Sequence, residues 1–361
     1  MSNSKNRVYI EGASIAGLTA ATRLAKFKYQ VTLSGKRYQN TVIDDFSFDS
    51  GALFTLPAVY RDFFQKTGKH FGQVLDVKPM DPAFIFKFED LQISFANLSR
   101  NERLKEIETK LGKEAAQEWD AALKQGEYLW DRIRENYVEW EFSLFRFNPD
   151  TYLRMRAPII RNPYLNKIMS HYATYLGYPS GLYKWSHIAA FVEESFGIWQ
   201  ISGGLEALTE AIKNRALELG VNFGESSDFD YYIDATQIHS TPTQRLLGLK
   251  DFPSEMPIRT VIFHRDGLTT DIYANKLATG KYSLVLTGKI DIDNFDRYAV
   301  VDQLREGVSG DSDNQILTKI RTANKRKFKV SHMDSLAHAG ITGELLANAV
   351  RGIKNRPSHE H

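Results

Sequence analysis

A glycine-containing turn near the start of the chain is the segment whose residue types best suit ligand chemistry. It follows a short β-branched and aromatic run at residues 8–10, and aliphatic residues then recur at helical spacing as far as Phe27. A helix that begins just after a strand presents unpaired N–H groups and the positive end of its dipole to an anion. We therefore predict a phosphate-binding turn that consists of Gly12, Ala13, Ser14, Ile15, Ala16 and Gly17.

Ser14 is the unusual residue of this turn. In turns that bind dinucleotides, a middle glycine lets the phosphate approach the backbone closely, and here Gly12 and Gly17 occupy only the outer two glycine positions. The hydroxymethyl group of Ser14 would either donate a hydrogen bond to a phosphate or crowd it. The sequence therefore leaves two interpretations open: a turn that still binds a nucleotide, and an inherited fold that has lost its ligand.

The end of the second expected strand, residues 29–33, indicates which nucleotide such a turn would bind. An acidic residue there binds a ribose 2′-hydroxyl, whereas a small residue followed by a base binds a 2′-phosphate. No carboxylate is present, and Ser34, Lys36 and Arg37 follow the strand. On charge alone, these three residues are candidate contacts for the 2′-phosphate of NADP. The alternative interpretation is an ordinary basic loop exposed to solvent.

Composition argues against several other classes of function. The 361 residues are 42% hydrophobic and 25% charged, which is typical of a globular protein, and a net charge of +2 gives no general attraction for nucleic acid. The absence of cysteine excludes disulfides, thiolate metal sites and cysteine nucleophiles. The histidines show no metal-ligand spacing, and no Gly-x-Ser-x-Gly motif supports serine hydrolysis, so we expect no metal and identify no catalytic residue.

The turn must be positioned by a strand, a helix and a second parallel strand, which together form a right-handed βαβ unit. We expect an α/β fold in which a Rossmann-like nucleotide-binding domain with a parallel sheet is joined to an α+β domain with a mixed sheet and amphipathic helices. A second strand at residues 328–330, a turn that contains Gly340 and Gly343, and a helix at residues 344–353 follow near the end of the chain, and they add Gly340 as a candidate binding residue. Other expected elements are a hairpin at 84–95, helices at 100–138 and 205–219, and strands at 221–223 and 231–234.

Four stretches carry a resemblance to a known family, and their order and spacing are more specific than any one of them. They are residues 8–21, 48–57, 75–83 and 196–208. On these stretches the chain resembles the phytoene desaturase-like branch of the FAD-dependent amine oxidase and carotene desaturase superfamily. The resemblance implies FAD as the cofactor and a hydrophobic, carotenoid or isoprenoid substrate. Residues that match the family's cofactor positions are Gly12, Ser14, Gly17, Gly51 and Asp334.

The resemblance also implies a discontinuous domain organisation. We expect the nucleotide-binding domain to comprise residues 1–75, 186–245 and 315–361, and the substrate-type domain to comprise residues 76–185 and 246–314. The sequence departs from the family pattern where FAD would be bound. The ribose-binding glutamate is absent, and the β-meander expected between Val221 and Ile233 is reduced to a few polar residues.

Three hypotheses follow. The first is an FAD-dependent desaturase-like oxidoreductase, the second is a catalytically inactive relative that acts as a binding or assembly partner, and the third is an NADP-binding variant. The polar N-terminus has no signal-peptide pattern, and no stretch reaches the roughly 20 apolar residues of a membrane span. We therefore expect a cytoplasmic protein and leave peripheral membrane contact open, while the oligomeric state is not indicated.

Overall fold

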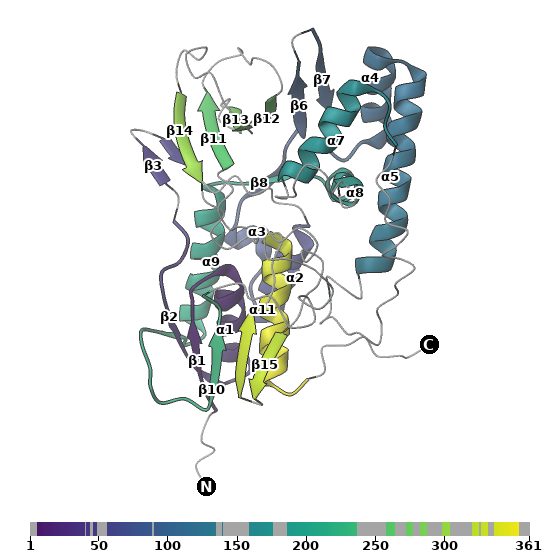
Figure 1. Cartoon of the computed structure of the whole chain (residues 1–361). Helices are drawn as coiled ribbons and strands as arrows, with labels where there is room; N and C mark the ends of the chain where they lie inside the picture. Colours follow the sequence, from purple (N-terminus) through teal and green to yellow (C-terminus); the bar gives the residue numbers. More distant parts are fainter. Residues whose placement is uncertain are drawn as a thin grey trace.

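The computed structural model describes most of the chain, namely residues 6–39, 41–43, 46–48, 56–88, 90–134, 139, 159–175, 186–236, 258–263, 272–276, 282–286, 298–303, 320–324, 326–330 and 336–353. These residues form two layered regions, one around a parallel sheet and one around an antiparallel sheet (Figure 1). Each region has its own cluster of buried apolar side chains. The expected combination of a Rossmann-like region with a second region is confirmed.

The first sheet has the strand order β15-β16-β10-β1-β2-β9. All neighbouring strands are parallel except β15, which runs antiparallel to β16. The expected strand–helix–strand unit is present at its centre, with helix α1 between β1 and β2. The strands are β1 (Arg7–Glu11), β2 (Gln30–Ser34), β9 (Asn222–Phe223), β10 (Tyr231–Asp234), β15 (Ile320–Asn324) and β16 (Lys327–Val330).

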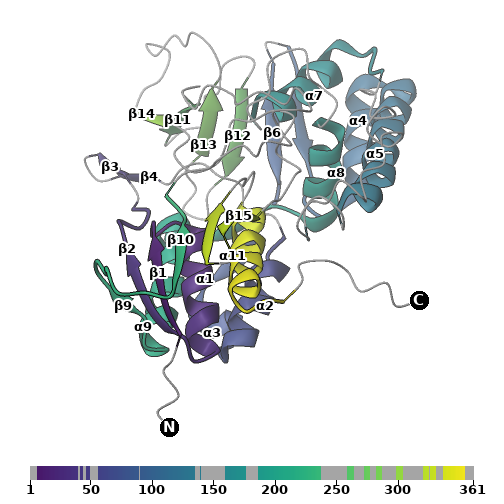
Figure 2. The same cartoon turned by 60° about the horizontal axis from the view of Figure 1, so that its bottom comes forward.

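Helices cover one face of this sheet (Figure 2). Helix α1 (Ile15–Lys26) packs between α9 (Gly204–Glu218) and α11 (Leu336–Val350). Alternate strand residues such as Val8, Ile10 and Leu33 share one buried apolar cluster with these helices, as the two-residue period of a strand requires. The intervening residues, which include Tyr9 and Tyr232, lie on the opposite face, where the loop of residues 224–230 crosses.

The second sheet has the order β14-β11-β13-β12-β6-β7, and every pairing in its described strands is antiparallel. The expectation of a mixed sheet is therefore wrong, although the predicted hairpin is present as β6 and β7. Because each strand pairs antiparallel with its neighbour, no helical crossover is needed within the sheet. The strands are β6 (Phe84–Lys87), β7 (Gln92–Phe95), β11 (Ile258–Phe263), β12 (Ile272–Lys276), β13 (Tyr282–Leu286) and β14 (Tyr298–Gln303).

The helices beside this sheet include one that the expected division assigned to the first region. Helix α8 (Ser186–Phe196) packs on α5 (Lys113–Ile133), and its buried apolar residues belong to the cluster of the second region. Residues 186–198 thus pack with the second region, while the expected domain boundaries stay predictions. The other helices of this region are α4 (Arg100–Leu111) and α7 (Pro163–Tyr175).

The two regions are joined by a short antiparallel pair of strands. Strand β5 (Val77–Pro79) pairs with β8 (Trp199–Ile201), and helices α2 (Ala58–Thr67) and α3 (Phe71–Val74) precede β5. A further pair comprises β3 (Thr41–Ile43) and β4 (Phe46–Phe48). Among the described helices, none is both long enough and apolar enough to cross a membrane.

Helix α11 begins earlier than the sequence indicated. It starts at Leu336, so Gly340 and Gly343 lie inside a helix and not in a turn before one. The reason is close packing: a Cβ on Gly343 would lie 2.6 Å from the carbonyl oxygen of Ala16, and one on Gly340 would lie 2.9 Å from a methyl group of Val59. These glycines let α11 approach α1 and α2 closely. In the sequence alone, a glycine with this role cannot be distinguished from a glycine in a turn.

Candidate functional site

The turn after β1 is shaped by two glycines that have no room for a side chain. Gly12 has a φ of 108°, and a Cβ there would lie 2.5 Å from the backbone of Ala235. A Cβ on Gly17 would lie 2.1 Å from the carbonyl oxygen of Gly12. The N–H of Gly12 also donates to the carbonyl of Ser34, at 3.0 Å. The ends of β1, β2 and β10 are therefore held against one another at the carboxyl edge of the sheet.

Ser14 is the N-cap of α1, and its hydroxyl is turned toward the protein. The hydroxyl accepts a hydrogen bond from the N–H of Gly17, at 3.2 Å, and donates one to the carbonyl of Ala235, at 3.1 Å. The N–H groups of Ile15 and Ala16 are the first two of the helix, so they have no intrahelical acceptor. With no acidic residue in the first turn of α1, this helix terminus favours an anion.

The end of β2 cannot easily carry the acidic residue that a ribose site would use. Gly35 follows the strand with a φ of 100°, and a Cβ there would lie 3.1 Å from the nitrogen of Ala13. A side chain at this position would therefore be strained and would also crowd the turn. The lack of a carboxylate at position 35, which the sequence shows, is thus consistent with this close contact.

The three residues proposed as phosphate contacts are not brought together. Arg37 lies along α9, where its guanidinium pairs with Glu206 at 3.2 Å and with Glu210 at 2.6 Å. Lys36 is exposed, whereas Ser34 is buried. Their roles as contacts of NADP stay predictions, and the ion pairs of Arg37 favour a role in packing.

A carboxylate does reach the end of β2, but from the loop that follows β9. The N–H of Gly224, just after β9, donates to the carbonyl of Leu33 at 3.0 Å, so the loop of residues 224–230 begins beside β2. The Tyr9 hydroxyl lies 2.8 Å from the hydroxyl oxygen of Ser34 and donates to the carboxylate of Glu225. Burial, followed by this carboxylate, raises the pKa of the Tyr9 phenol. Sequence reasoning missed Tyr9 and Glu225, because no local motif links them.

Three other predicted binding residues have different outcomes. Gly51 and Asp334 lie outside the described residues. Gly340 lies within α11 and contacts α2, so its expected place in a turn is wrong. Within the part of the chain that the structure describes, no cluster of three or more His, Asp or Glu residues could hold a metal ion.

Sequence comparison relates the chain to carotenoid enzymes. It is 24% identical over 244 residues to the 4,4′-diapolycopene oxygenase of a Methylomonas species, which covers 61% of this chain and 49% of the relative. It is 26% identical over 247 residues to the zeta-carotene-forming phytoene desaturase of Myxococcus xanthus, which covers 62% and 47%. The chain thus spans about half the length of the curated relatives that it matches. No family model matches it.

Comparison with solved structures relates the fold to amine oxidases. The cyclohexylamine oxidase of Brevibacterium oxydans has a TM-score of 0.62 at 10% identity, over 96% of this chain and 99% of that one. At this identity the similarity shows the fold alone. The sequence relatives thus confirm the resemblance to phytoene desaturase-like proteins over part of the chain, and the solved structures confirm the fold.

Proposed function

We propose that this chain is an FAD-dependent oxidoreductase of the phytoene desaturase-like type that acts on a hydrophobic, isoprenoid substrate. The similarity to carotenoid desaturases and oxygenases supports the substrate class. The observation that carries the cofactor proposal is the turn after β1, which leaves the N–H groups of Ile15 and Ala16 at the carboxyl edge of a parallel sheet. When bound there, FAD would supply the redox chemistry by accepting a hydride equivalent from a polyene.

The described residues fit the phosphate part of this cofactor better than the ribose part. The first N–H groups of α1 would bind the pyrophosphate, and the inward orientation of the Ser14 hydroxyl keeps its oxygen on the helix. The adenosine ribose would have no side-chain acceptor at Gly35. Glu225, which contacts Tyr9 beside Ser34, is the carboxylate that would accept hydrogen bonds from the ribose hydroxyls.

Replacing Ile15 with proline tests the phosphate contact without removing the helix. Proline is well tolerated at the first helical position and removes one N–H, and Ser14 has the extended backbone that a residue before proline needs. Because a hydrogen bond to a charged group contributes about 1.5–3 kcal/mol, we expect Ile15→Pro to weaken FAD binding at least tenfold in a flavin fluorescence titration. The control is Arg100→Pro at the first position of α4, and Ile15→Ala removes the side chain alone.

The absorbance of the freshly purified protein between about 350 and 500 nm is the first measurement, because a bound flavin absorbs there. A protein without flavin bands that also takes up no FAD would contradict the proposal. Full FAD affinity in Ile15→Pro would contradict the placement of the phosphate at this turn, while leaving the cofactor itself in place.

Two alternative functions remain to be compared with the first. A catalytically inactive relative is favoured by the loop of residues 224–230, which replaces the β-meander that the resemblance implies, and by Gly35. Turnover of any polyene would refute it. The NADP-binding variant is weakened by the pairing of Arg37 with α9, and an unchanged melting temperature at saturating NADP would exclude it.

A further inference from the structure

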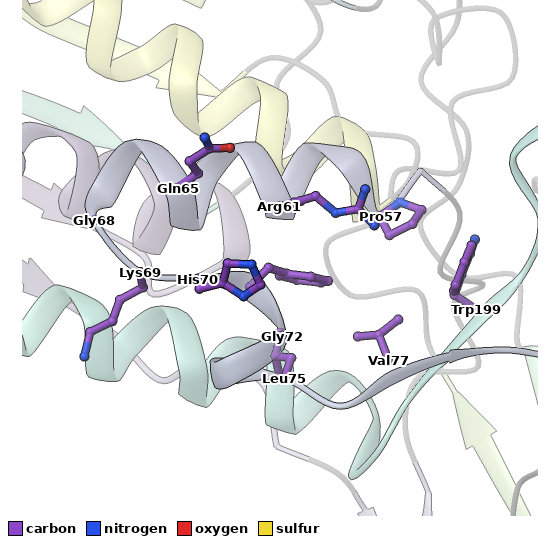
Figure 3. A pocket seen from close by; sticks show the side chains of 11 residues that line it. Pro57, Arg61, Gln65, Gly68, Lys69, His70, Gly72, Leu75, Val77 and Trp199 are labelled. Carbon is purple, nitrogen blue, oxygen red and sulfur yellow. The ribbon is translucent and has the colours of Figure 1, made fainter.

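A groove lies along α2 (Figure 3), and none of the residues of the turn after β1 is in its described lining. Its volume is about 760 Å³, and it is bounded by α2, α3 and the pair of strands β5 and β8. This volume falls within the range of roughly 300–1,000 Å³ that small-molecule sites occupy. No function described above uses this groove.

The groove is open because two of its lining residues are glycines and only one side of α2 borders it. Helix α2 contributes Arg61 and Gln65 from one edge, because residues four apart lie on the same side of a helix. Gly68 follows the last residue of α2 with a φ of 91°. Because it is a glycine, no side chain closes that end of the groove. Gly72 of α3 also lacks a side chain, and a Cβ there would meet nothing closer than the His70 ring, at 3.7 Å.

Apolar side chains in fixed positions line the opposite wall. Phe71 and Leu75 are buried, and Phe71 packs against Phe64 with their ring centroids 6.0 Å apart. Trp199 at the start of β8 is half-buried, and its indole N–H donates to the carbonyl of Phe196 at 2.8 Å. An apolar molecule in the groove would therefore meet a wall that is already ordered.

The ionisable residues of the described lining are all basic. Among the described residues, Arg61, Lys69 and His70 line the groove, and no aspartate or glutamate does. Lys69 is paired with Glu218 at 3.1 Å. Arg61 is exposed and makes no ion pair with any residue in the described ranges. The groove thus combines an apolar wall with one guanidinium that has no acidic partner in the described part of the chain, which suits a carboxylate or phosphate.

We propose that this groove binds a discrete anionic amphiphile, with its carboxylate or phosphate on Arg61 and its apolar body against Phe71, Leu75 and Trp199. A bilayer surface fits less well, because a membrane-docking face carries exposed large apolar residues. Those of the described part of the chain lie elsewhere, at Leu98, Tyr128, Ile159, Leu217, Phe223 and Ile353. The proposal requires neither FAD nor the turn after β1.

Calorimetric titration of the purified full-length protein with decanoate, decyl phosphate and uncharged decanol tests the proposal, at concentrations below micelle formation. Both anions are expected to bind, and Arg61→Gln should weaken their binding about tenfold while leaving that of decanol unchanged. Arg161→Gln, which removes an exposed arginine outside the groove, should change none of the three. The anion that binds more tightly to the native protein identifies the preferred head group.

A second variant tests the apolar wall. Gly72→Leu places a side chain in the open groove and should weaken the binding of decanoate and that of decanol to the same extent. Equal binding of decanol and decanoate, no effect of Arg61→Gln, an equal effect of Arg161→Gln, or no binding at all would each overturn the proposal. The flavin content of Arg61→Gln should equal that of the native protein, so this result is independent of the proposed function.

Discussion

The two faces of the parallel sheet are covered in different ways. On one face, Val8, Ile10 and Leu33 are buried beneath α1, α9 and α11. On the other, the described covering is the loop of residues 224–230, in which Phe229 stacks on Tyr9 with their centroids 5.5 Å apart. This loop is also held by Arg7, which contacts Asp228 and Asp230. One face is thus an apolar core, and the other is a polar and aromatic surface.

The two faces of the sheet therefore differ in what a substitution would test. Gly12, Gly17 and Gly343 are among the glycines with no room for a side chain, and their contacts lie on the helix side or at the turn next to it. The departures from the family pattern, namely Gly35 and the short loop, lie at the end of β2 and over the other face. Substitutions on the helix side should therefore test the fold, whereas those on the loop side should test what the sheet still binds.

The largest effect is expected for Gly17→Ala. Its Cβ would lie 2.1 Å from the carbonyl oxygen of Gly12, so the backbone of the turn or of α1 must move. We expect a loss of about 4 kcal/mol in the free energy of unfolding, measured by urea denaturation. Gly72→Ala is the matched control, because its Cβ meets nothing closer than 3.7 Å. Equal stability of the two variants would show that the turn is more adaptable than this contact implies.

Ile10→Ala tests the apolar core beneath the helices. Ile10 is fully buried between the sheet and α1, so its removal leaves a cavity. We expect a loss of about 3 kcal/mol in the free energy of unfolding, and a loss of about 1 kcal/mol for Ile10→Val, which removes one methylene group. If Ile10→Ala cost no more than Ile10→Val, the helix-covered face would not be the main source of stability.

The helix-covered half of this fold could be predicted from the sequence because its signals are local. Strand alternation, helical spacing and the glycines after β1 place β1, α1 and β2 within a few residues of where the structure has them. The start of α11 could not be placed, because a glycine used for close helix packing looks the same in a sequence as one used in a turn. The packing of α8 on α5 is a tertiary preference with no local signature.

The candidate site was predictable only where one segment forms it. The turn of residues 12–17 is contiguous and was found. The contact of Glu225 with Tyr9 joins a loop residue to a strand residue that is distant in the sequence, and it depends on how the loop of residues 224–230 folds over the sheet. Likewise, the sequence alone makes Arg37 a candidate phosphate contact. Its partners on α9, Glu206 and Glu210, are distant in the sequence, so the ion pairs cannot be anticipated. Long-range pairing therefore decided which basic residues stay available.

Phe229→Ala tests the loop-covered face and should have a smaller effect. The ring stacks on Tyr9 and lies 5.9 Å from the ring of Tyr232, centroid to centroid, but it is only partly buried. We expect a loss of about 1 kcal/mol in the free energy of unfolding, a typical contribution of such aromatic pairs. Phe223→Ala on exposed β9 is the control and should change it by less than about 0.5 kcal/mol. A loss as large as that of Ile10→Ala would show that the two faces of the sheet contribute equally to the stability of the fold.

The smallest effect is expected in the pH dependence of stability, through Asp230, which attaches the same loop to Arg7. Hydrogen bonds from the backbone N–H and guanidinium of Arg7 lower the pKa of Asp230. A carboxyl whose folded pKa is lowered stabilises the fold above its unfolded pKa, near 4, and this contribution is lost as the pH falls through the folded value. The melting temperature of Asp230→Asn should therefore fall less than that of the native protein between about pH 6 and pH 3. Asp131→Asn is the control, because Asp131 is an exposed residue of α5 and its replacement removes a carboxylate without affecting the loop. If Asp230→Asn and the native protein lost the same number of degrees, the contact between Arg7 and Asp230 would contribute nothing to the stability of the fold.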